Sequence, residues 1–493
     1  MFEKITPEQA GISSANVADF ISVLERRGLA THSVLMMKGN SIFAEYYWAP
    51  FHRDFCHRMY SETKSYVSIA VGLLEEDGLI DLDKPIVDYF SEKIDGELHH
   101  YRTMQTVRDM LKMQTAGDTP FWFTHPDPDR THLYMNTLGN ARRAGTMWEY
   151  DSAGSQVLGA LVEKIAGKSL FDFLNERVFS KLGTFKTATI LKTQNGDSWA
   201  DSALVCTSRD MASFGRFVLN YGNWNGEQLL NERYLREATA PLVCNCEDGW
   251  LGAFRYGYGY QIWCTEQGGF AFNGMGHQFT IMHPATDTVF VITSDNQGNL
   301  PARELIVNTY FDYIVTPMQK NALPADPAAE KKLAEQTAHL KLRVARGVTT
   351  HENAEKLNGK VFTCRESRSG IKQFSLHFNG DEGEFRYTNA QGDKVLPFGI
   401  GKNVFCKFPE LGYSDGVGGE RTTNGFMYDA AVSAAWQTDG KLMLVCQIID
   451  RYFGNFSATF GFVDNEVTVR MVKTAEDFLG SYQGMLCGTC EEL

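Results

Sequence analysis

Apolar residues recur at helical spacing in several segments of the first 320 residues. After Ser61, the residues Val67, Ala70, Val71 and Leu74 fall on one face of a helix. A glycine at position 78 supplies a stop signal for that helix. The same spacing predicts four more helical segments, the second of them broken near position 167: 106–117, 152–179, 207–222 and 302–315.

Two other segments have the pattern of strands joined by tight turns. Residues 32–48 read as a hairpin around Lys38-Gly39-Asn40, and residues 279–296 read as two strands around a turn at Pro284–Asp287. Strands therefore lie at both ends of this region, with helices between them. The order predicts an α+β fold, with one antiparallel sheet built from both ends and backed by a helical block.

The pattern changes after residue 320. A stretch with three prolines and few apolar residues, 316–332, predicts a domain boundary. Beyond Asn358, short alternating runs are separated by Gly, Asn and Asp, which is typical of a β-barrel or sandwich. We therefore predict a first domain over 1–320, a linker over 321–335 and a C-terminal β-barrel domain over 336–493.

Charge and hydropathy narrow the classes of partner. The net charge is −13 and Lys and Arg form no dense cluster, which argues against nucleic acid. The N-terminal residues lack a basic head and an apolar core, and no segment approaches the roughly 18 apolar residues of a membrane span. We expect a cytoplasmic protein that acts on a small molecule or short peptide, without nucleic acid or membrane partners. A homo-oligomer stays open.

The ten cysteines are expected to be thiols, because a long cytoplasmic chain does not need disulfides. Cys244-x-Cys246 and Cys487-x-x-Cys490 invite a metal or redox interpretation. No set of His and Cys residues has the spacing of a zinc site, so we expect no metal.

Two S-x-x-K matches occur, Ser61/Lys64 and Ser369/Lys372. The second lies in a Gly-containing, strand-rich segment, where positions i and i+3 point to opposite faces. The first opens an apolar helix, where i and i+3 share a face. A serine there gains from the backbone N–H groups and positive dipole of the helix N-terminus, and a buried lysine with a lowered pKa can accept its proton. The alternative is a serine cap followed by a solvated lysine.

A second motif favours chemistry at Ser61. Tyr150-Asp151-Ser152 stands just before a predicted helix. With both motifs in order, residues 5 to 315 resemble the serine β-lactamase and penicillin-binding-protein superfamily, particularly its class C-like esterases, amidases and D-aminopeptidases. The resemblance implies a β-lactamase/transpeptidase-like fold, with Ser61 as nucleophile and Lys64 and Tyr150 as proton-transfer groups. The C-terminal part is similar to the lipocalin-like domain of some members.

The third family element, K-T-G or H-x-G on a strand, has no close match. Its best placement sets Met275-Gly276-His277 there, without a lysine. The resemblance implies that the backbone N–H of Gln278 joins that of Ser61 in an oxyanion hole. His277 and Ser152 are candidate substrate contacts, although a lone histidine beside a strand is more often structural. Without the lysine we expect neutral esters and amides to react better than penicillins.

Aromatic residues offer candidate pocket walls. The adjacent aromatics at 121–123 either recognise substrate or pack as a cluster. Tyr256, Tyr258 and Tyr260 would share one face of a strand; packing is the default, with Tyr258 or Tyr260 at the cleft rim.

These features predict a serine hydrolase that works through an acyl-enzyme on small esters, amides or peptides with D-residues. It needs no metal or organic cofactor. The alternative is a β-lactamase-like binding protein, either an acyl sensor that does not turn over or an inactive scaffold.

Overall fold

The computed structural model describes residues 2–119, 125–246, 252–413 and 425–491. The chain divides into two compact units, the first comprising Met1–Lys341 and the second beginning at Leu342. Helix α12 (Pro327–Thr337) belongs to the first unit and lies where the sequence predicts a linker. It packs on helix α1 (Ser14–Arg27): Leu333 is buried, and the Gln336 side chain donates to the carbonyl of Ala18.

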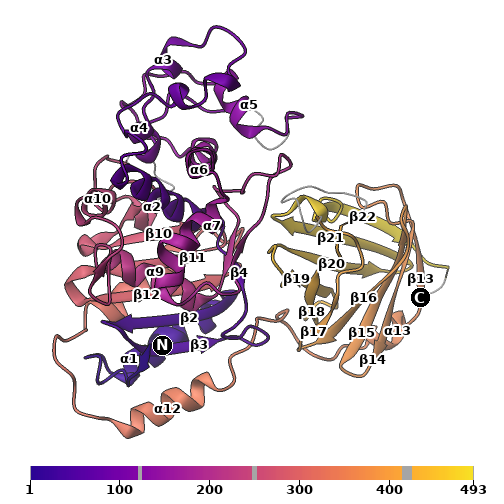
Figure 1. Ribbon diagram of the computed structural model, residues 1–493. Coiled ribbons are helices and arrows are strands. Elements are labelled where there is room, and N and C mark those ends of the chain that lie inside the picture. Colours follow the sequence, from indigo (N-terminus) through magenta and orange to yellow (C-terminus); the bar gives the residue numbers. More distant parts are fainter. Residues whose placement is uncertain (1, 120–124, 247–251, 414–424, 492–493) are drawn as a thin grey trace. The chain divides into compact units, whose positions relative to one another are not determined.

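The first unit is built on a seven-stranded sheet (Figure 1). Only the short pair β1–β3 is parallel. In spatial order the strands are β1 (Glu3–Lys4), β3 (Ser41–Tyr47), β2 (Thr31–Lys38), β12 (Thr288–Ser294), β11 (Gln278–His283), β10 (Phe270–Gly274) and β9 (Trp263–Cys264).

The predicted sheet and both predicted hairpins are confirmed. Strands β2 and β3 meet across the expected turn, and β11 and β12 meet across Pro284–Thr286. The antiparallel pairing of β12 with β2 sets Phe290 opposite Met36, which joins the two ends of the region. Antiparallel neighbours of this kind need no crossover, so the helical block can be inserted between them.

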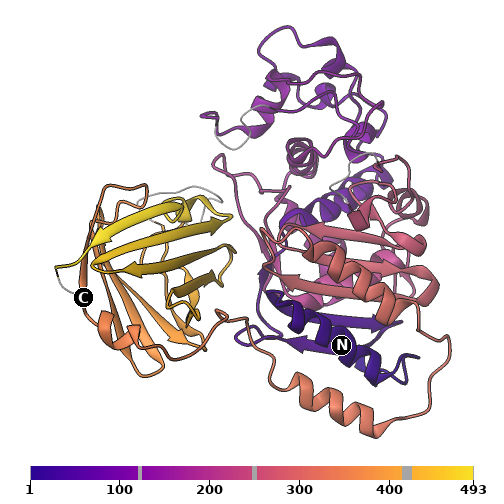
Figure 2. The same cartoon turned by 180° about the vertical axis from the view of Figure 1, so that it is seen from behind.

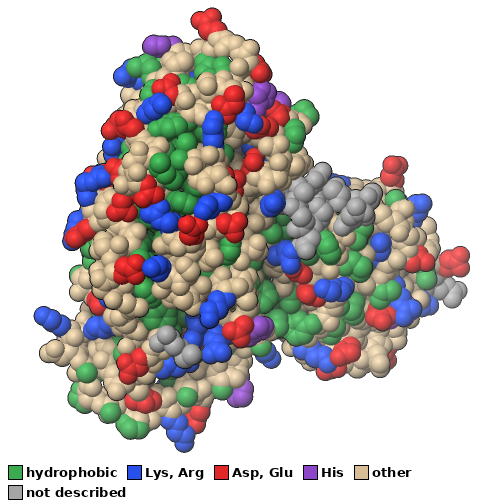
Figure 3. Space-filling view, in the orientation of Figure 1, with side chains coloured by type: hydrophobic (Ala, Val, Ile, Leu, Met, Phe, Trp, Pro, Cys, Tyr) green, Lys and Arg blue, Asp and Glu red, His purple; other side chains and the backbone are tan. Residues whose placement is uncertain are grey.

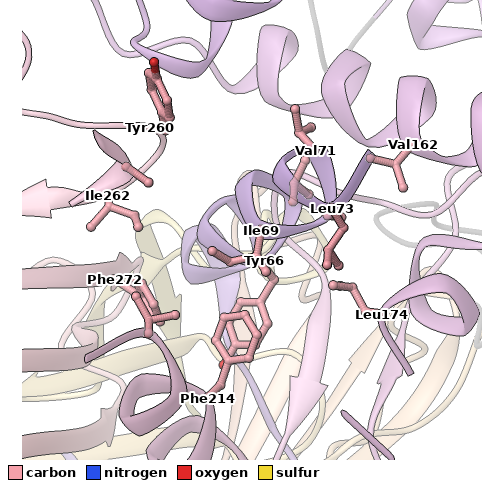
Figure 4. Packing of buried hydrophobic residues seen from close by; sticks show 14 of the residues in the cluster. Tyr66, Ile69, Val71, Leu73, Val162, Leu174, Phe214, Tyr260, Ile262 and Phe272 are labelled. Atoms are coloured by element: carbon pink, nitrogen blue, oxygen red, sulfur yellow. The ribbon is translucent and has the colours of Figure 1, made fainter. Parts of the chain in front are cut away.

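Helices cover both faces of this sheet. Alternate residues of β2 enter different clusters: Leu35 and Met37 pack with α2 (Thr63–Glu76), α6 (Ser152–Ala166) and α9 (Ser208–Leu219). On that side the Tyr66 and Phe214 rings stack at 4.0 Å (Figure 4).

The opposite face of the sheet packs on other helices. Val34 and Met36 lie with residues of α1 and of α11 (Ala302–Tyr310), which cross the sheet in Figure 2. The period of two along the strand thus separates two cores.

The remaining elements of the first unit are short. The helices are α3 (His100–Thr103), α4 (Val107–Leu111), α5 (Arg130–Asn136), α7 (Leu170–Leu174), α8 (Ser180–Leu182) and α10 (Glu232–Ala238). The strands are β4 (His57–Arg58), β5 (Thr189–Ile190), β6 (Leu204–Cys206), β7 (Asn223–Trp224) and β8 (Glu227–Gln228).

Helix α4 is shorter than predicted. The sequence pattern extends it to Gly117, but it ends at Leu111. Met113 takes a left-handed φ of 55°, which a helix cannot continue through. The backbone N–H of Ala116 then donates to the side chain of Gln105 at 2.7 Å instead of to a helical carbonyl.

The second unit is a closed β-barrel, as the sequence predicts. Parallel pairing of β16 with β18 closes a barrel of nine strands. Strand β17 pairs antiparallel with the first half of β18. Helix α13 (Asn353–Leu357) precedes the strands, which are β13 (Val361–Cys364), β14 (Gln373–Asn379), β15 (Glu382–Asn389), β16 (Gly392–Ile400), β17 (Val404–Lys407), β18 (Asp429–Trp436), β19 (Leu442–Ile448), β20 (Asn455–Val463), β21 (Glu466–Thr474) and β22 (Gly484–Thr489). Its buried aromatic contacts include Phe374 against Phe385 and Phe460.

Basic and acidic side chains are intermixed on the face shown in Figure 3. Within the described parts of the chain, no helix combines the length and the apolar character needed to cross a membrane.

Candidate active site

Ser61 lies in a single 3-10 turn, Tyr60–Glu62, that leads directly into helix α2. The preceding Tyr60 is buried and takes a φ of 49°. This left-handed conformation costs a residue with a Cβ roughly 1–2 kcal/mol. The surrounding packing therefore holds the chain in a sharp bend immediately before Ser61.

Lys64 lies one helical turn after Ser61 and its side chain is only 2% exposed. Its amine donates to Ser61 Oγ at 3.0 Å and to the backbone carbonyl of Asp201 at 2.7 Å. The carboxylate of Asp201 lies 3.8 Å from the same nitrogen. An ammonium has three donors, and these contacts fix the direction of two of them. The predicted proximity of Ser61 and Lys64 is therefore present in the structure.

Tyr150 lies close to the Lys64 amine. The amine stands 5.1 Å from the centre of the Tyr150 ring, within the range of a cation–π contact. Trp263 stacks on the ring at 5.7 Å. The next residue, Asp151, caps helix α6 by accepting from the N–H of Gly154 at 2.9 Å. The cap fixes the position at which Tyr150 enters the site.

The hairpin β10–β11 packs against the segment before Ser61. A Cβ added to Gly274 would lie 2.1 Å from the carbonyl oxygen of Met59, so the two backbones touch at a position that only glycine can occupy. At the start of β11, the buried Gln278 side chain donates to the carbonyl of Met275 at 2.9 Å and accepts from the N–H of Ser294 at 3.0 Å. These bonds fix the backbone of Gln278, whose oxyanion role stays a prediction.

His277 occupies the turn of this hairpin with a φ of 71°. Its ring is 9% exposed and lies against Phe279. Burial, with a smaller effect from the charge of Arg303, lowers the pKa of His277 to about 4, so the imidazole is neutral near pH 7. Among the described residues its buried Nδ1 has no hydrogen-bond partner. That unpaired ring nitrogen could meet a substrate, and the substrate role of His277 stays a prediction.

Sequence reasoning missed two groups of this neighbourhood. Asp201, which holds Lys64, comes from a segment without a periodic pattern. Arg303 is mostly buried and lies within electrostatic range of both His277 and Tyr150. It lies twenty positions after the hairpin ends at His283 and belongs to no motif, so only the packing of α11 brings it here.

Other expected contacts have different outcomes. Ser152 is the first residue of α6 and is half-buried; its substrate role stays a prediction. For Tyr258 and Tyr260 the default expectation of packing is confirmed, because they are 0% and 2% exposed, and neither forms an exposed cleft rim. Tyr258 packs on Trp148 and Trp263, whereas Tyr256 is exposed. The aromatic residues at 121–123 lie outside the described residues.

Cys244 and Cys246 are exposed and their sulfurs lie 2.7 Å apart. In the described ranges, no cluster of three or more His, Cys, Asp or Glu residues has the geometry to hold a metal ion.

Comparison with known proteins identifies the family of the chain. The sequence model of the family described as Beta-lactamase matches residues 17–308, well over half of the chain. The chain therefore belongs to the β-lactamase family, the class of serine-type hydrolases that includes esterases and amidases.

The 6-aminohexanoate-dimer hydrolase of Paenarthrobacter ureafaciens is 29% identical over 309 residues, which are 58% of this chain and 78% of the relative. Two solved structures share the fold. A Bacillus anthracis protein classed as a 6-aminohexanoate-dimer hydrolase has a TM-score of 0.53 at 22% identity, covering 63% of this chain and 86% of its own. A penicillin-binding-protein homolog from Caulobacter crescentus has a TM-score of 0.50 at 15% identity, covering 62% and 99%.

Proposed function

We propose that the protein cleaves small esters or amides through an acyl-enzyme on Ser61. The observation that carries this proposal is the 3.0 Å hydrogen bond between Ser61 Oγ and the buried amine of Lys64 at a helix start. When the amine is neutral, the same contact is the path by which the serine loses its proton.

In the proposed reaction, Ser61 Oγ bonds to the substrate carbonyl carbon while its proton passes to Lys64. The carbonyl oxygen becomes an anion that the N–H groups of Ser61 and Gln278 stabilise. The proton then passes, with Tyr150 as relay, to the leaving oxygen or nitrogen as its bond to carbon breaks. Water attacks the ester on Ser61 in the same manner, releasing the acid and restoring the serine.

The name of the Paenarthrobacter relative describes hydrolysis of an amino-acid dimer, which supports a small linear amide as the substrate class for this chain. Small esters and peptides with D-residues remain candidates. The alternative is a protein that is acylated without turnover, or is inactive; the altered third element, with Met275 in place of a lysine, favours that alternative. A cytoplasmic location and a homo-oligomeric state belong to this proposal and need fractionation and sizing experiments.

Release of p-nitrophenol from short acyl esters, followed from milliseconds, separates these functions. An enzyme should give a burst followed by a steady rate. A burst of one equivalent without a steady rate would identify an acyl sensor. No release above that of the Ser61→Ala variant would identify an inactive scaffold.

A further inference from the structure

Glu62, the residue after the proposed nucleophile, is 0% exposed. Glutamate is seldom fully buried unless a partner compensates it. The carboxyl oxygens Oε1 and Oε2 lie 3.3 and 3.2 Å from Thr280 Oγ1, whose hydroxyl donates to them. A side chain in the turn of Ser61 therefore contacts the strand on the opposite side of the site.

Thr280 is a rigid partner. It lies on β11 in the middle of the sheet, paired with Phe272 of β10 and Val291 of β12. Its methyl group packs against α9, since a Cβ added to Gly215 would lie 2.7 Å from it. Thr280 also follows Gln278 by two residues, so both side chains lie on one face of the strand, roughly 6.6 Å apart along it.

We propose that Glu62 is a positioning residue that clamps the turn carrying Ser61 to strand β11, and so fixes the separation of the Ser61 and Gln278 N–H groups. The inference rests on the proposed function, because the clamp serves an oxyanion site. The two donors come from elements far apart in the chain, and a shift of about 1 Å between them would cost much of their effect on a transition state.

The surroundings of Glu62 favour its neutral form. Two titratable groups interact electrostatically with Glu62: the Tyr66 phenol of α2 and the Cys206 thiol of β6. Both also interact with the Asp210 carboxyl of α9. Each of these three groups is negative when ionised. Burial raises the pKa of Glu62 well above its usual range, and the Thr280 hydroxyl and N–H offset this only in part. An ionised Glu62 would place a negative charge on the residue next to Ser61 and oppose formation of the tetrahedral anion.

The test compares Glu62→Gln, Glu62→Ala, Thr280→Val and the double variant Glu62→Ala/Thr280→Val with wild type and Ser61→Ala. Glutamine keeps an acceptor of the same size and cannot ionise, whereas alanine removes the clamp. Hydrolysis of a p-nitrophenyl acyl ester is measured between pH 6 and 10, with thermal melting of each full-length variant. Glu8→Gln is the matched control, because Glu8 is also buried and bonded, to Ser14 N at 2.6 Å and Ser14 Oγ at 2.9 Å.

A clamp predicts that Glu62→Ala lowers kcat at least thirtyfold with KM within threefold. Glu62→Gln should stay within threefold near pH 7 and lose less activity than wild type at alkaline pH. Thr280→Val should lower kcat, and the double variant should be no worse than Glu62→Ala. Glu8→Gln should change melting only.

The clamp would be overturned if wild type is active and a folded Glu62→Ala or Thr280→Val variant has the same kcat. That outcome would leave the proposed function standing. If the losses of kcat in the two single variants multiply in the double variant, the two residues act independently, and this would also overturn the clamp. Wild type as inert as Ser61→Ala would instead refute the proposed function, and the clamp with it. If Glu62→Ala does not fold, Thr280→Val and the pH profile of Glu62→Gln decide.

Discussion

The two sides of the candidate site differ in how they are encoded. On one side, Ser61 and Lys64 are three residues apart, and the helix that follows brings them within 3.0 Å. On the other side, the hairpin β10–β11 reaches the site only because the sheet places it against Met59. Local periodicity determines the first side, whereas the second depends on contacts more than 200 residues apart in the chain.

This difference shows where sequence motifs predict site geometry reliably. A helical i,i+3 pair carries its own geometry, so residue type and spacing suffice. A turn that supplies backbone N–H groups imposes few side-chain requirements. Gly274 is the exception, since its contact with Met59 excludes a Cβ. The hairpin can therefore carry Met275 and His277 in place of the family pattern and keep its place.

The largest expected effect falls on the helix side. Ser61→Ala should abolish labelling by a fluorophosphonate probe and reduce ester hydrolysis to background, because Ser61 carries the proposed acyl-enzyme. Ser369→Ala is the matched control, since Ser369 lies in a loop before β14 and bonds Ser367. Intact protein mass measures the label. Labelling that persists in Ser61→Ala and disappears in Ser369→Ala would reverse the assignment.

Lys64→Ala and Tyr150→Phe should each lower kcat at least about a hundredfold, the usual scale of a proton-transfer group. Lys64→Ala also removes the bond to Asp201, so melting must be measured beside the kinetics. Tyr150→Phe keeps the ring that stacks on Trp263 and should melt like wild type. Near-normal turnover in a folded variant would remove that residue from the mechanism.

Much of the fold follows from periodicity. The apolar run Val34–Met37 before the turn at Lys38-Gly39-Asn40 predicts a strand, and the structure assigns alternate residues of that run to different cores. The end of α4 could not be read in this way, because the buried Met113 takes a left-handed backbone that its residue type does not signal. Tyr258 is also buried by tertiary packing, between Trp148 and Trp263.

The site follows the same division. Residue type, spacing and order along the chain predict Ser61, Lys64 and Tyr150, and the structure brings these three residues together. Asp201 and Arg303 carry no signal of that kind, since one holds Lys64 through a backbone carbonyl and the other arrives with helix α11.

On the hairpin side, His277 should make the protein sensitive to acid. Its pKa is about 4 in the folded state against an ordinary 6.5, so the unfolded chain binds the proton more tightly. Its contribution is complete above pH 6.5 and is lost as pH falls towards 4, by about 2 kcal/mol at pH 5. Urea unfolding of full-length His277→Gln should therefore show a smaller stability difference between pH 7 and pH 5 than wild type.

A histidine with the opposite shift is the control for that prediction. Asp127 and Asp95 raise the pKa of His132, so it stabilises the fold below its ordinary pKa and loses that contribution as pH rises. His132→Gln should widen the difference between pH 7 and pH 5. Equal differences in wild type and His277→Gln would show that His277 is not held neutral.

The smallest effect concerns Met275, which our predicted placement sets where the family pattern has a lysine and which is 49% exposed. Wild type should hydrolyse a neutral p-nitrophenyl ester with a higher kcat/KM than nitrocefin, whose carboxylate finds no charge at this position. Met275→Lys should raise kcat/KM for nitrocefin about tenfold and leave kcat/KM for the ester unchanged. This gain is smaller than a buried ion pair would give, because solvent screens a half-exposed charge. Met275→Gln is the uncharged control.

If wild type already hydrolyses nitrocefin as fast as the ester, Arg303 is the cation that the hairpin lacks, since its charge reaches Tyr150 and His277. Arg303→Gln should then lower nitrocefin turnover alone, and the substrate carboxylate would be recognised from helix α11 instead of from the strand.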